Sequence, residues 1–178
     1  MPQKEPLRFD ELLAGARHSA IHLELRDFYA VADEADDYRR WRETGERDVD
    51  PTSAYWAPWV AMVRAATARG VVVRRIRIVS EPVSDYIKYE HAGTTVNAAA
   101  GEEVRWLPRH QTVGLLLPAV DGWLFDDKRL LLNHFTGEGQ WAAVPMELRM
   151  EPDFVKAYAD ATEAVWERAV PHAEYKIR

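Results

Sequence analysis

The 178-residue sequence contains no cysteine. Disulfides, thiolate catalysis and cysteine-ligated zinc are therefore excluded, and the absence agrees with a reducing cytoplasm. The sequence also lacks a long apolar run, because the longest, from Val113 to Val120, is too short to span a membrane and contains a proline. The first residues have no apolar core of the kind that a secretion signal requires. We expect a cytoplasmic protein that is not in a membrane.

Basic residues are in the minority, since 23 lysines and arginines stand against 29 acidic residues, for a net charge of −6. Because phosphate contacts supply most of the non-specific affinity for DNA, this charge argues against direct nucleic-acid binding. An acidic chain can instead bind a basic partner, such as a DNA-binding protein. The short run with Arg39, Arg40 and Arg42 leaves open a module that binds nucleic-acid ends, although such runs are usually a solvated helix face.

Recognised catalytic motifs are also missing. The six histidines show no zinc-binding spacing, and the sequence has no Gly-x-Ser-x-Gly, no phosphate-binding Gly-x-x-x-x-Gly-Lys and no Gly-x-Gly-x-x-Gly. Asp126 and Asp127 could suggest acid–base chemistry, but adjacent acids between two strands usually form a turn. We therefore expect no metal, no cofactor and no enzyme of a recognised type.

Hydrophobic periodicity predicts one α/β domain over residues 1–178, of which residues 1–8 should be flexible. Predicted helices cover about 9–16, 30–42, 55–69, a segment from Ser80 onward and 152–170, and predicted strands cover about 19–29, 71–79, 103–107, 122–125, 129–135 and 140–144. Residues 92–101 are predicted as a small-residue loop or frayed helix. A helix that ends at Gly70 and leads at once into a strand favours parallel pairing of 21–28 with 71–79. We expect a mixed, partly parallel central sheet with helices on both faces.

Both predicted parallel strands carry charged residues. In the first, apolar residues at positions 21, 23 and 25 alternate with polar residues at 22, 24 and 26, which predicts one covered face. In the second, Arg75 and Arg77 point to one face and Arg74 to the other. A buried guanidinium needs a partner, which Glu24 or Glu81 could supply. Alternatively, Arg75 and Arg77 hold a phosphate or carboxylate ligand.

Polar side chains also follow the predicted strands at their carboxyl ends. In a parallel sheet these ends meet at one edge, where ligands usually bind. Helix capping and surface ion pairs are the structural explanation for the same residues, above all for Ser80 and Asp85. The candidate ligand-binding residues are Arg26, Asp27, Ser80, Glu81, Asp85, Arg109 and His110, together with Arg75 and Arg77.

Seven tryptophans are many for this length, and several aromatic residues gather around the start of the third predicted helix. Core packing is the ordinary explanation for each of them. Aromatic residues beside arginines are, however, also enriched in protein interfaces. The candidate partner-binding residues are Trp41, Tyr55, Trp56 and Trp59.

Four segments carry a resemblance to a known family: Val79–Tyr86, Gly101–Arg109, Trp123–Asp127 and Trp166–Ala169. From about Phe9 to its end, the chain resembles an uncharacterised domain family of actinobacteria that has no assigned reaction. Genes of that family tend to lie beside helix-turn-helix regulators and their small accessory proteins. The resemblance therefore implies a regulatory protein partner.

The order of elements is also similar to one half of the phospholipase D fold, of which degenerate copies occur in some regulators. The chemistry of that superfamily requires His-x-Lys, followed by Asp a few residues later. No histidine here has a lysine two positions on, since His110 is followed by Thr112 and His134 by Thr136. The resemblance thus implies a fold without its catalytic pair, in which a ligand pocket could persist.

The sequence supports two functions of different classes. The first is a non-catalytic regulatory or interaction module that acts with a helix-turn-helix DNA-binding protein and senses a small anionic ligand at the edge from Ser80 to Asp85. The alternative is a small hydrolase or phosphodiesterase that uses Glu81, Asp85 and His110, whose side chains must then converge around a cleft.

Overall fold

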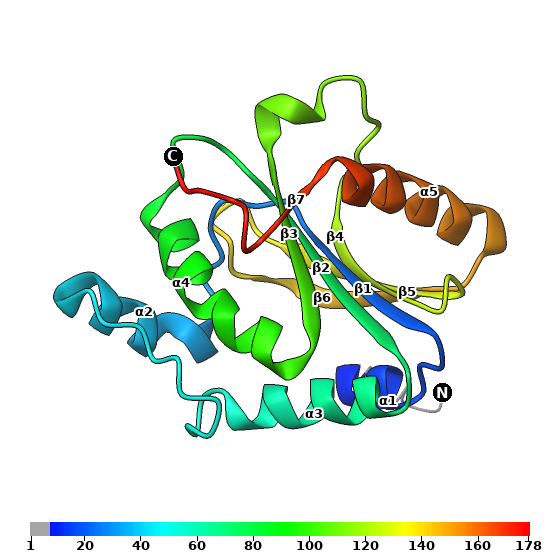
Figure 1. Cartoon of the computed structure of the whole chain (residues 1–178). Coiled ribbons are helices and arrows are strands. Elements are labelled where there is room, and N and C mark those ends of the chain that lie inside the picture. The colour runs from blue at the N-terminus through cyan, green and yellow to red at the C-terminus, as the bar shows by residue number, and fades with distance from the viewer. Residues whose placement is uncertain (1–7) are drawn as a thin grey trace.

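Seven strands form one mixed sheet in the order β6-β5-β4-β1-β2-β3-β7 (Figure 1). The computed structural model describes residues 8–178. The strands are β1 (Ser19–Glu24), β2 (Val72–Val79), β3 (Glu102–Pro108), β4 (Asp121–Phe125), β5 (Arg129–Phe135), β6 (Trp141–Arg149) and β7 (Val170–Pro171). The helices are α1 (Phe9–Ala14), α2 (Ala32–Thr44), α3 (Ala57–Ala68), α4 (Asp85–Ala100) and α5 (Pro152–Arg168), with a short 3-10 helix η1 (Arg109–Thr112) after β3.

The first two strands pair in parallel, which confirms the sequence prediction. β1 and β2 are in register from Ser19 opposite Val72 to Glu24 opposite Arg77. β3 extends the parallel half beside β2, whereas β4, β5 and β6 form an antiparallel meander on the other side of β1. Parallel neighbours cannot be joined by a tight turn, so helices α2 and α3 lead into β2 and helix α4 leads into β3.

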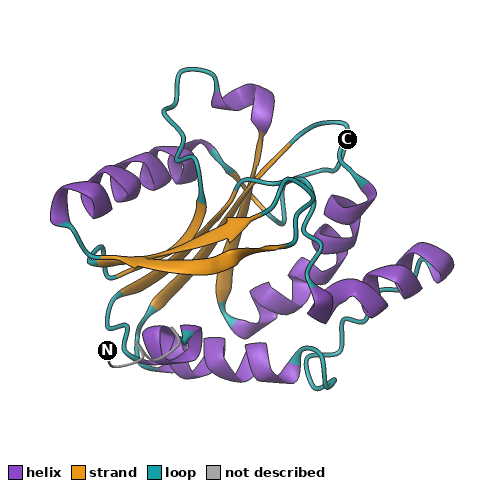
Figure 2. Ribbon diagram, turned by 180° about the vertical axis from the view of Figure 1, so that it is seen from behind, coloured by secondary structure: helices purple, strands orange, loops and turns teal. Residues whose placement is uncertain are grey.

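Helices cover both faces of the sheet, and the predicted fold class is confirmed (Figures 1 and 2). α5 packs on one face, where its Val165 joins Leu23 and Ile76 in a core. α1, α3 and α4 lie against the other face, where Val63 of α3 joins Val73. The expectation that β1 has one covered face is wrong, because every residue of β1 after Ser19 is buried. The polar side of β1 therefore lies inside the molecule.

The start of α4 differs from the prediction by one turn. The helix begins at Asp85, and its N-cap is Ser84, whose side chain accepts a hydrogen bond from the backbone N–H of Ile87 at 3.2 Å. Ser80 belongs instead to the end of the strand. An N-cap must accept from the first turn of its own helix, and here only the nearer serine is in reach.

The rest of α4 is also more regular than its composition suggests. Residues 92–101 are not a loop, because the helix runs unbroken to Ala100. Small residues bring this helix close to its neighbours, and a Cβ on Gly93 would lie 3.0 Å from the guanidinium of Arg47. β6 extends to Arg149, beyond the predicted 140–144, and the short β7 is not apparent in the sequence.

No helix between residues 8 and 178 has both the length and the apolar composition needed to cross a membrane. The segment predicted to be flexible, residues 1–8, lies outside the described residues except for Arg8.

Candidate functional site

The carboxyl ends of the parallel strands do bring three of the predicted residues together. Ser80 donates to the Asp27 carboxylate from its backbone N–H at 2.7 Å and from its hydroxyl at 2.6 Å. Arg109 donates to the Ser80 hydroxyl at 3.2 Å and to the carbonyl oxygens of Leu25 and Ile78 at 2.5 and 3.2 Å. Through these contacts the three residues join the segments that follow β1, β2 and β3, while the Arg109 side chain stays 37% exposed.

The remaining predicted residues of this edge go to separate places. Glu81 accepts from the Tyr175 hydroxyl at 3.0 Å and lies 3.9 Å from Nδ1 of His110. Asp85 is exposed and pairs with Lys88 on its own helix at 2.8 Å. Arg26 turns to the carbonyl oxygen of Gly137 at 3.1 Å. We call Asp27, Ser80, Glu81, Arg109 and His110 the strand-end rim.

Arg75 and Arg77 of β2 lie elsewhere, on the sheet face below α3 and α4. Arg75 pairs with Glu24 and with Glu102, each at 2.7 Å. Arg77 pairs with Glu24 at 2.8 Å and with Glu90. Glu24 is thus the partner that the sequence suggested, and Glu81 is not. All five side chains are nearly inaccessible to solvent, and we call them the ion network.

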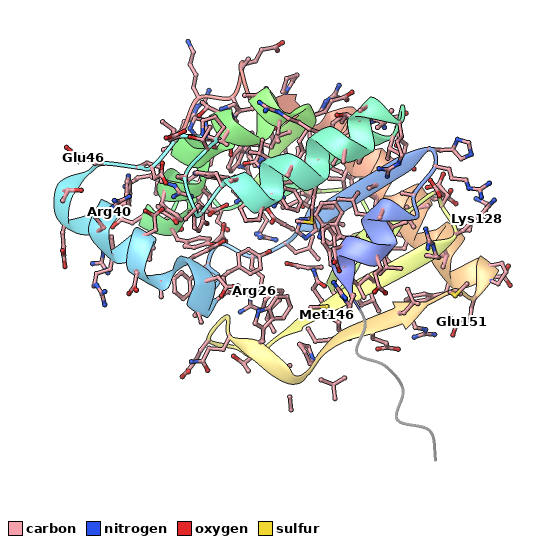
Figure 3. The ribbon with its side chains drawn as sticks, turned by 90° about the horizontal axis from the view of Figure 1, so that it is seen from below. Arg26, Arg40, Glu46, Lys128, Met146 and Glu151 are labelled. Atoms are coloured by element: carbon pink, nitrogen blue, oxygen red, sulfur yellow. The ribbon has the colours of Figure 1, made fainter. Side chains whose placement is uncertain are left out.

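A cavity of about 410 Å³ opens above the ion network, on the same face of the sheet. Its aromatic walls are Tyr29, Trp59, Tyr86, Trp123, Phe135 and Trp141, and its polar lining includes His22, Glu24, Glu34, Glu90, Asp121 and Asn133. Phe9 of α1 and Met146 of β6 also line it, and Met146 is labelled in Figure 3. A smaller space of about 220 Å³ shares Glu34, Trp59, Arg75 and Glu90 with it. We call the larger space the sheet-face cavity.

Besides the exposed Asp33, two carboxylates of the sheet-face cavity lie outside the ion network. Glu34 accepts a hydrogen bond from the Tyr86 hydroxyl at 2.7 Å, and Asp121 accepts one from the Tyr29 hydroxyl. The two tyrosine rings lie 6.0 Å apart between their centroids. Among residues 8–178, no lysine or arginine nitrogen lies within salt-bridge distance of either carboxylate.

The cavity changes the acidity of its side chains. Burial and the nearby Glu90 carboxylate raise the pKa of Glu34 to about 7. Burial likewise raises the pKa of Asp121 to about 6. Burial and the charges of Arg75 and Arg77 hold the pKa of His22 well below its usual value, so its imidazole is neutral. Perturbed groups that line one cavity are typical of functional sites.

Glu34→Gln should remove part of the pH dependence of stability. The folded chain holds the Glu34 proton more tightly than the unfolded chain, so wild-type stability falls as the pH rises from about 4.5 to about 7. The variant should therefore be more stable than the wild type by about 1–3 kcal/mol near pH 8 and equal to it near pH 4. The other groups that face Glu34 stay in place: Tyr86 and Glu90 of α4, Arg77 of β2 and Glu24 of β1. Urea denaturation at both pH values measures the difference, and an equal difference at both contradicts the prediction.

The aromatic residues predicted to bind a partner lie mainly inside the molecule. Trp56 is 7% exposed, and its indole N–H donates to the carbonyl oxygen of Asp48 at 2.8 Å. Trp59 lines the sheet-face cavity and donates to Glu102 at 3.3 Å. Tyr55 and Trp41 are half-buried, Tyr55 against Trp56 and Trp41 against aromatic residues of α2 and α4. These side chains offer little surface to another protein.

The basic run on α2 is a solvated helix face, as its ordinary interpretation predicts. Arg39 pairs with Asp36 and Arg40 with Asp37, each at 2.7 Å. Because neighbouring carboxylates neutralise these arginines, the run offers little net positive charge to a nucleic-acid end.

The sequence matches a family model described as Domain of unknown function (DUF6879) over residues 7–177. A search of the curated proteins found no significant match. Solved structures with a similar fold do exist, and they share little sequence with this chain.

Among these structures is Nuc from Salmonella typhimurium, described as a phospholipase D family member, with 11% identity, a TM-score of 0.52 and coverage of 91% of this chain and 86% of that one. NucT from Helicobacter pylori has 11% identity, a TM-score of 0.49 and coverage of 91% and 87%. The archaeal chromatin protein TrmBL2 has 11% identity and a TM-score of 0.48, with 90% of this chain covering about half (47%) of that one. The likeness to Nuc concerns the fold alone.

Proposed function

We propose that this chain, which belongs to the family described as Domain of unknown function (DUF6879), is a non-catalytic regulatory module. It binds a small molecule in the sheet-face cavity and acts with a helix-turn-helix DNA-binding protein. The observation that carries this function is the cavity itself. It combines aromatic walls with a few polar groups, two of which have strongly raised pKa values. Ligand pockets of proteins have this composition and size.

The chemistry of the cavity floor supports binding rather than catalysis. In the ion network each arginine is engaged by two carboxylates, so neither guanidinium is free to stabilise a developing negative charge. His22 is stacked on Trp123 with the ring centroids 4.3 Å apart, and its low pKa makes it a poor proton acceptor near neutral pH. The residue two positions after His22 is Glu24, not lysine.

A protein partner is supported by charge and by family context. The net charge of −6 suits a basic partner better than a nucleic acid. The resemblance described above implies a helix-turn-helix regulator as a genomic neighbour, which supports this proposal. We expect the partner to be such a regulator, encoded beside the gene for this chain.

Co-expression of the chain with that regulator tests the proposed function. The two proteins should elute together in size-exclusion chromatography and remain together at an ionic strength that screens weak surface contacts. The matched control is the regulator mixed with an unrelated protein of equal net charge. Separate elution of the two chains at micromolar concentration contradicts the regulatory role.

A hydrolase at the strand-end rim is the alternative that the same preparation can exclude. Glu81 and His110 approach each other to 3.9 Å, but Asp85 is engaged with Lys88. We therefore expect the chain to leave bis(4-nitrophenyl) phosphate intact over hours. Hydrolysis that is lost in His110→Ala would favour the enzyme over the regulatory module.

A further inference from the structure

The lining of the sheet-face cavity also indicates which class of ligand it binds. This inference rests on the proposed function. We propose that the cavity binds a small organic cation, a protonated aliphatic amine, between the Glu34 and Asp121 carboxylates and the aromatic walls. This ligand has the opposite charge to the anionic ligand that the sequence suggested. The preference follows from charge balance, from the aromatic walls and from His22.

Negative charge is in excess around the cavity. Besides the exposed Asp33, five carboxylates belong to the cavity and the ion network (Glu24, Glu34, Glu90, Glu102 and Asp121). Two guanidinium groups of the same set, Arg75 and Arg77, face them, and Arg26 outside the set is near enough to Asp121 to lower its pKa in part. Both guanidinium groups are taken up by Glu24, Glu90 and Glu102. The carboxylates that remain, Glu34 and Asp121, hold only tyrosine hydroxyls and a backbone N–H. A protonated amine would supply the missing positive charge and the missing donors.

The walls beside these two carboxylates are aromatic. Tyr29 lies 5.0 Å from Phe135 and Phe135 lies 4.4 Å from Trp141, measured between ring centroids. Aromatic faces attract cations, and they do so more strongly where water is excluded. The molecule already uses this contact deeper on the same face, where the Arg75 guanidinium lies 5.4 Å from the Trp59 ring and 5.7 Å from the Trp123 ring.

His22 does not offset this negative charge. It lines the cavity with its side chain 11% exposed, and its Nδ1 lies 3.4 Å from the Glu24 carboxylate. Because burial and the charges of Arg75 and Arg77 hold the pKa of His22 well below its usual value, its imidazole is neutral and leaves the excess of carboxylates for a cationic ligand.

Other charged ligands fit less well. An anion would meet Glu34 and Asp121 and would find no guanidinium that is not already engaged. A metal ion would need several ligands around one point, and no group of three or more histidine, aspartate or glutamate side chains within residues 8–178 is arranged to hold one. The shape and lining of the cavity therefore favour an organic cation.

Titration of the full chain with three probes of equal length tests this inference: hexylammonium chloride, sodium hexanoate and hexanol. Trp59, Trp123 and Trp141 line the cavity, so quenching of tryptophan fluorescence reports occupancy. Near pH 8, above the pKa of about 7 of Glu34, hexylammonium should quench in a saturable way and bind at least about tenfold more tightly than hexanoate or hexanol.

Two variants locate the bound cation. Glu34→Gln and Asp121→Asn each remove a charge and keep an acceptor for the neighbouring tyrosine, and each should weaken hexylammonium binding by roughly tenfold or more. Glu46→Gln removes a charge from an exposed residue beyond the end of α2 and should leave binding unchanged (Figure 3). Far-UV circular dichroism confirms that the variants are folded.

The titration results distinguish a failure of the inferred cationic ligand from a failure of the small-molecule binding site itself. Tighter binding of hexanoate, or equal binding of hexanol, overturns the cationic ligand and leaves the cavity as a binding site. If Glu34→Gln and Asp121→Asn do not weaken hexylammonium binding, the cation binds elsewhere, and the inference is overturned. No saturable quenching by any of the three probes overturns the inference and the small-molecule part of the proposed function together.

Discussion

Arg77→Met should lower the free energy of unfolding by about 3–5 kcal/mol, the largest effect that we expect from a single substitution in this chain. Arg77 lies inside the ion network with its side chain 6% exposed, and it pairs with Glu24 and Glu90, whose side chains are each 10% exposed. Methionine fills much of the same volume but leaves Glu90 without a cation. A buried carboxylate that has lost its partner must be desolvated without compensation or take up a proton.

Urea denaturation of Arg77→Met beside Arg74→Met measures this effect. Arg74 lies on the same strand but on the opposite face, with its side chain 29% exposed and its carboxylate partners, Glu103 and Glu163, each 3.6 Å away. Such a half-exposed pair contributes at most about 1 kcal/mol. Equal losses in the two variants would contradict the assignment of the ion network as a buried, mutually dependent set.

Asp126→Ala should cost about 2–4 kcal/mol of folding free energy. Its carboxylate accepts hydrogen bonds from the backbone N–H groups of Arg17, His18 and Ser19 at 3.0, 2.7 and 3.0 Å, and so joins the β4–β5 turn to the start of β1. Burial raises the pKa of Asp126, but these backbone donors outweigh it and the net pKa is below the usual value. The variant would leave three donors without this acceptor.

Asp127→Ala is the matched control for Asp126→Ala. Both residues have positive φ, 53° for Asp126 and 54° for Asp127, so alanine meets the same backbone strain at either position. Asp127→Ala should therefore cost only about 1 kcal/mol. Because the pKa of Asp126 is lower in the folded chain, its carboxylate stabilises the fold at pH values above the ordinary aspartate pKa of 3.8. The difference in unfolding free energy between wild type and Asp126→Ala should therefore narrow as the pH falls below that value. Equal losses at positions 126 and 127, or a gap that does not narrow, would contradict this role.

Much of the fold follows from local patterns in the sequence. The β-branched residues of β2 and the glycine that precedes them predict a buried parallel strand, because a helix that ends at Gly70 must return beside β1. Asp126 and Asp127 are turn residues because aspartate tolerates positive φ. The interior of α4 is the exception, since a run of alanine, glycine and threonine has no apolar period. It is helical because its small side chains permit close packing against Arg47 and Trp56.

The location of the cavity could not be predicted from the same patterns. Polar residues at strand ends point to a rim, and the structure does gather Asp27, Ser80 and Arg109 there, but they bind one another. The sheet-face cavity depends on strand order, which sets Asp121 of β4 near β1, and on the path of α2, which carries Glu34 over the sheet. Neither is visible in local periodicity.

One sequence signal did point to this face. The polar residues His22 and Glu24 of β1 lie opposite Arg75 and Arg77 in the parallel register. Because helices cover both faces of the sheet, polar residues on one side of two neighbouring strands, with Glu24 opposite Arg77, indicate a buried polar layer rather than a solvent-exposed face. Glu90 and Glu102 complete that layer from α4 and β3, where each alone resembles an ordinary surface acid.

The affinity of hexylammonium for Glu34→Gln, compared with its affinity for Asp27→Asn, tests most directly whether the functional site lies on the sheet face or at the strand-end rim. Each substitution removes one carboxylate charge and keeps a hydrogen-bond acceptor. If the sheet-face cavity is the site, Glu34→Gln weakens binding by roughly tenfold or more and Asp27→Asn changes it by less than about twofold. The reverse order, with the loss confined to Asp27→Asn, would contradict the account.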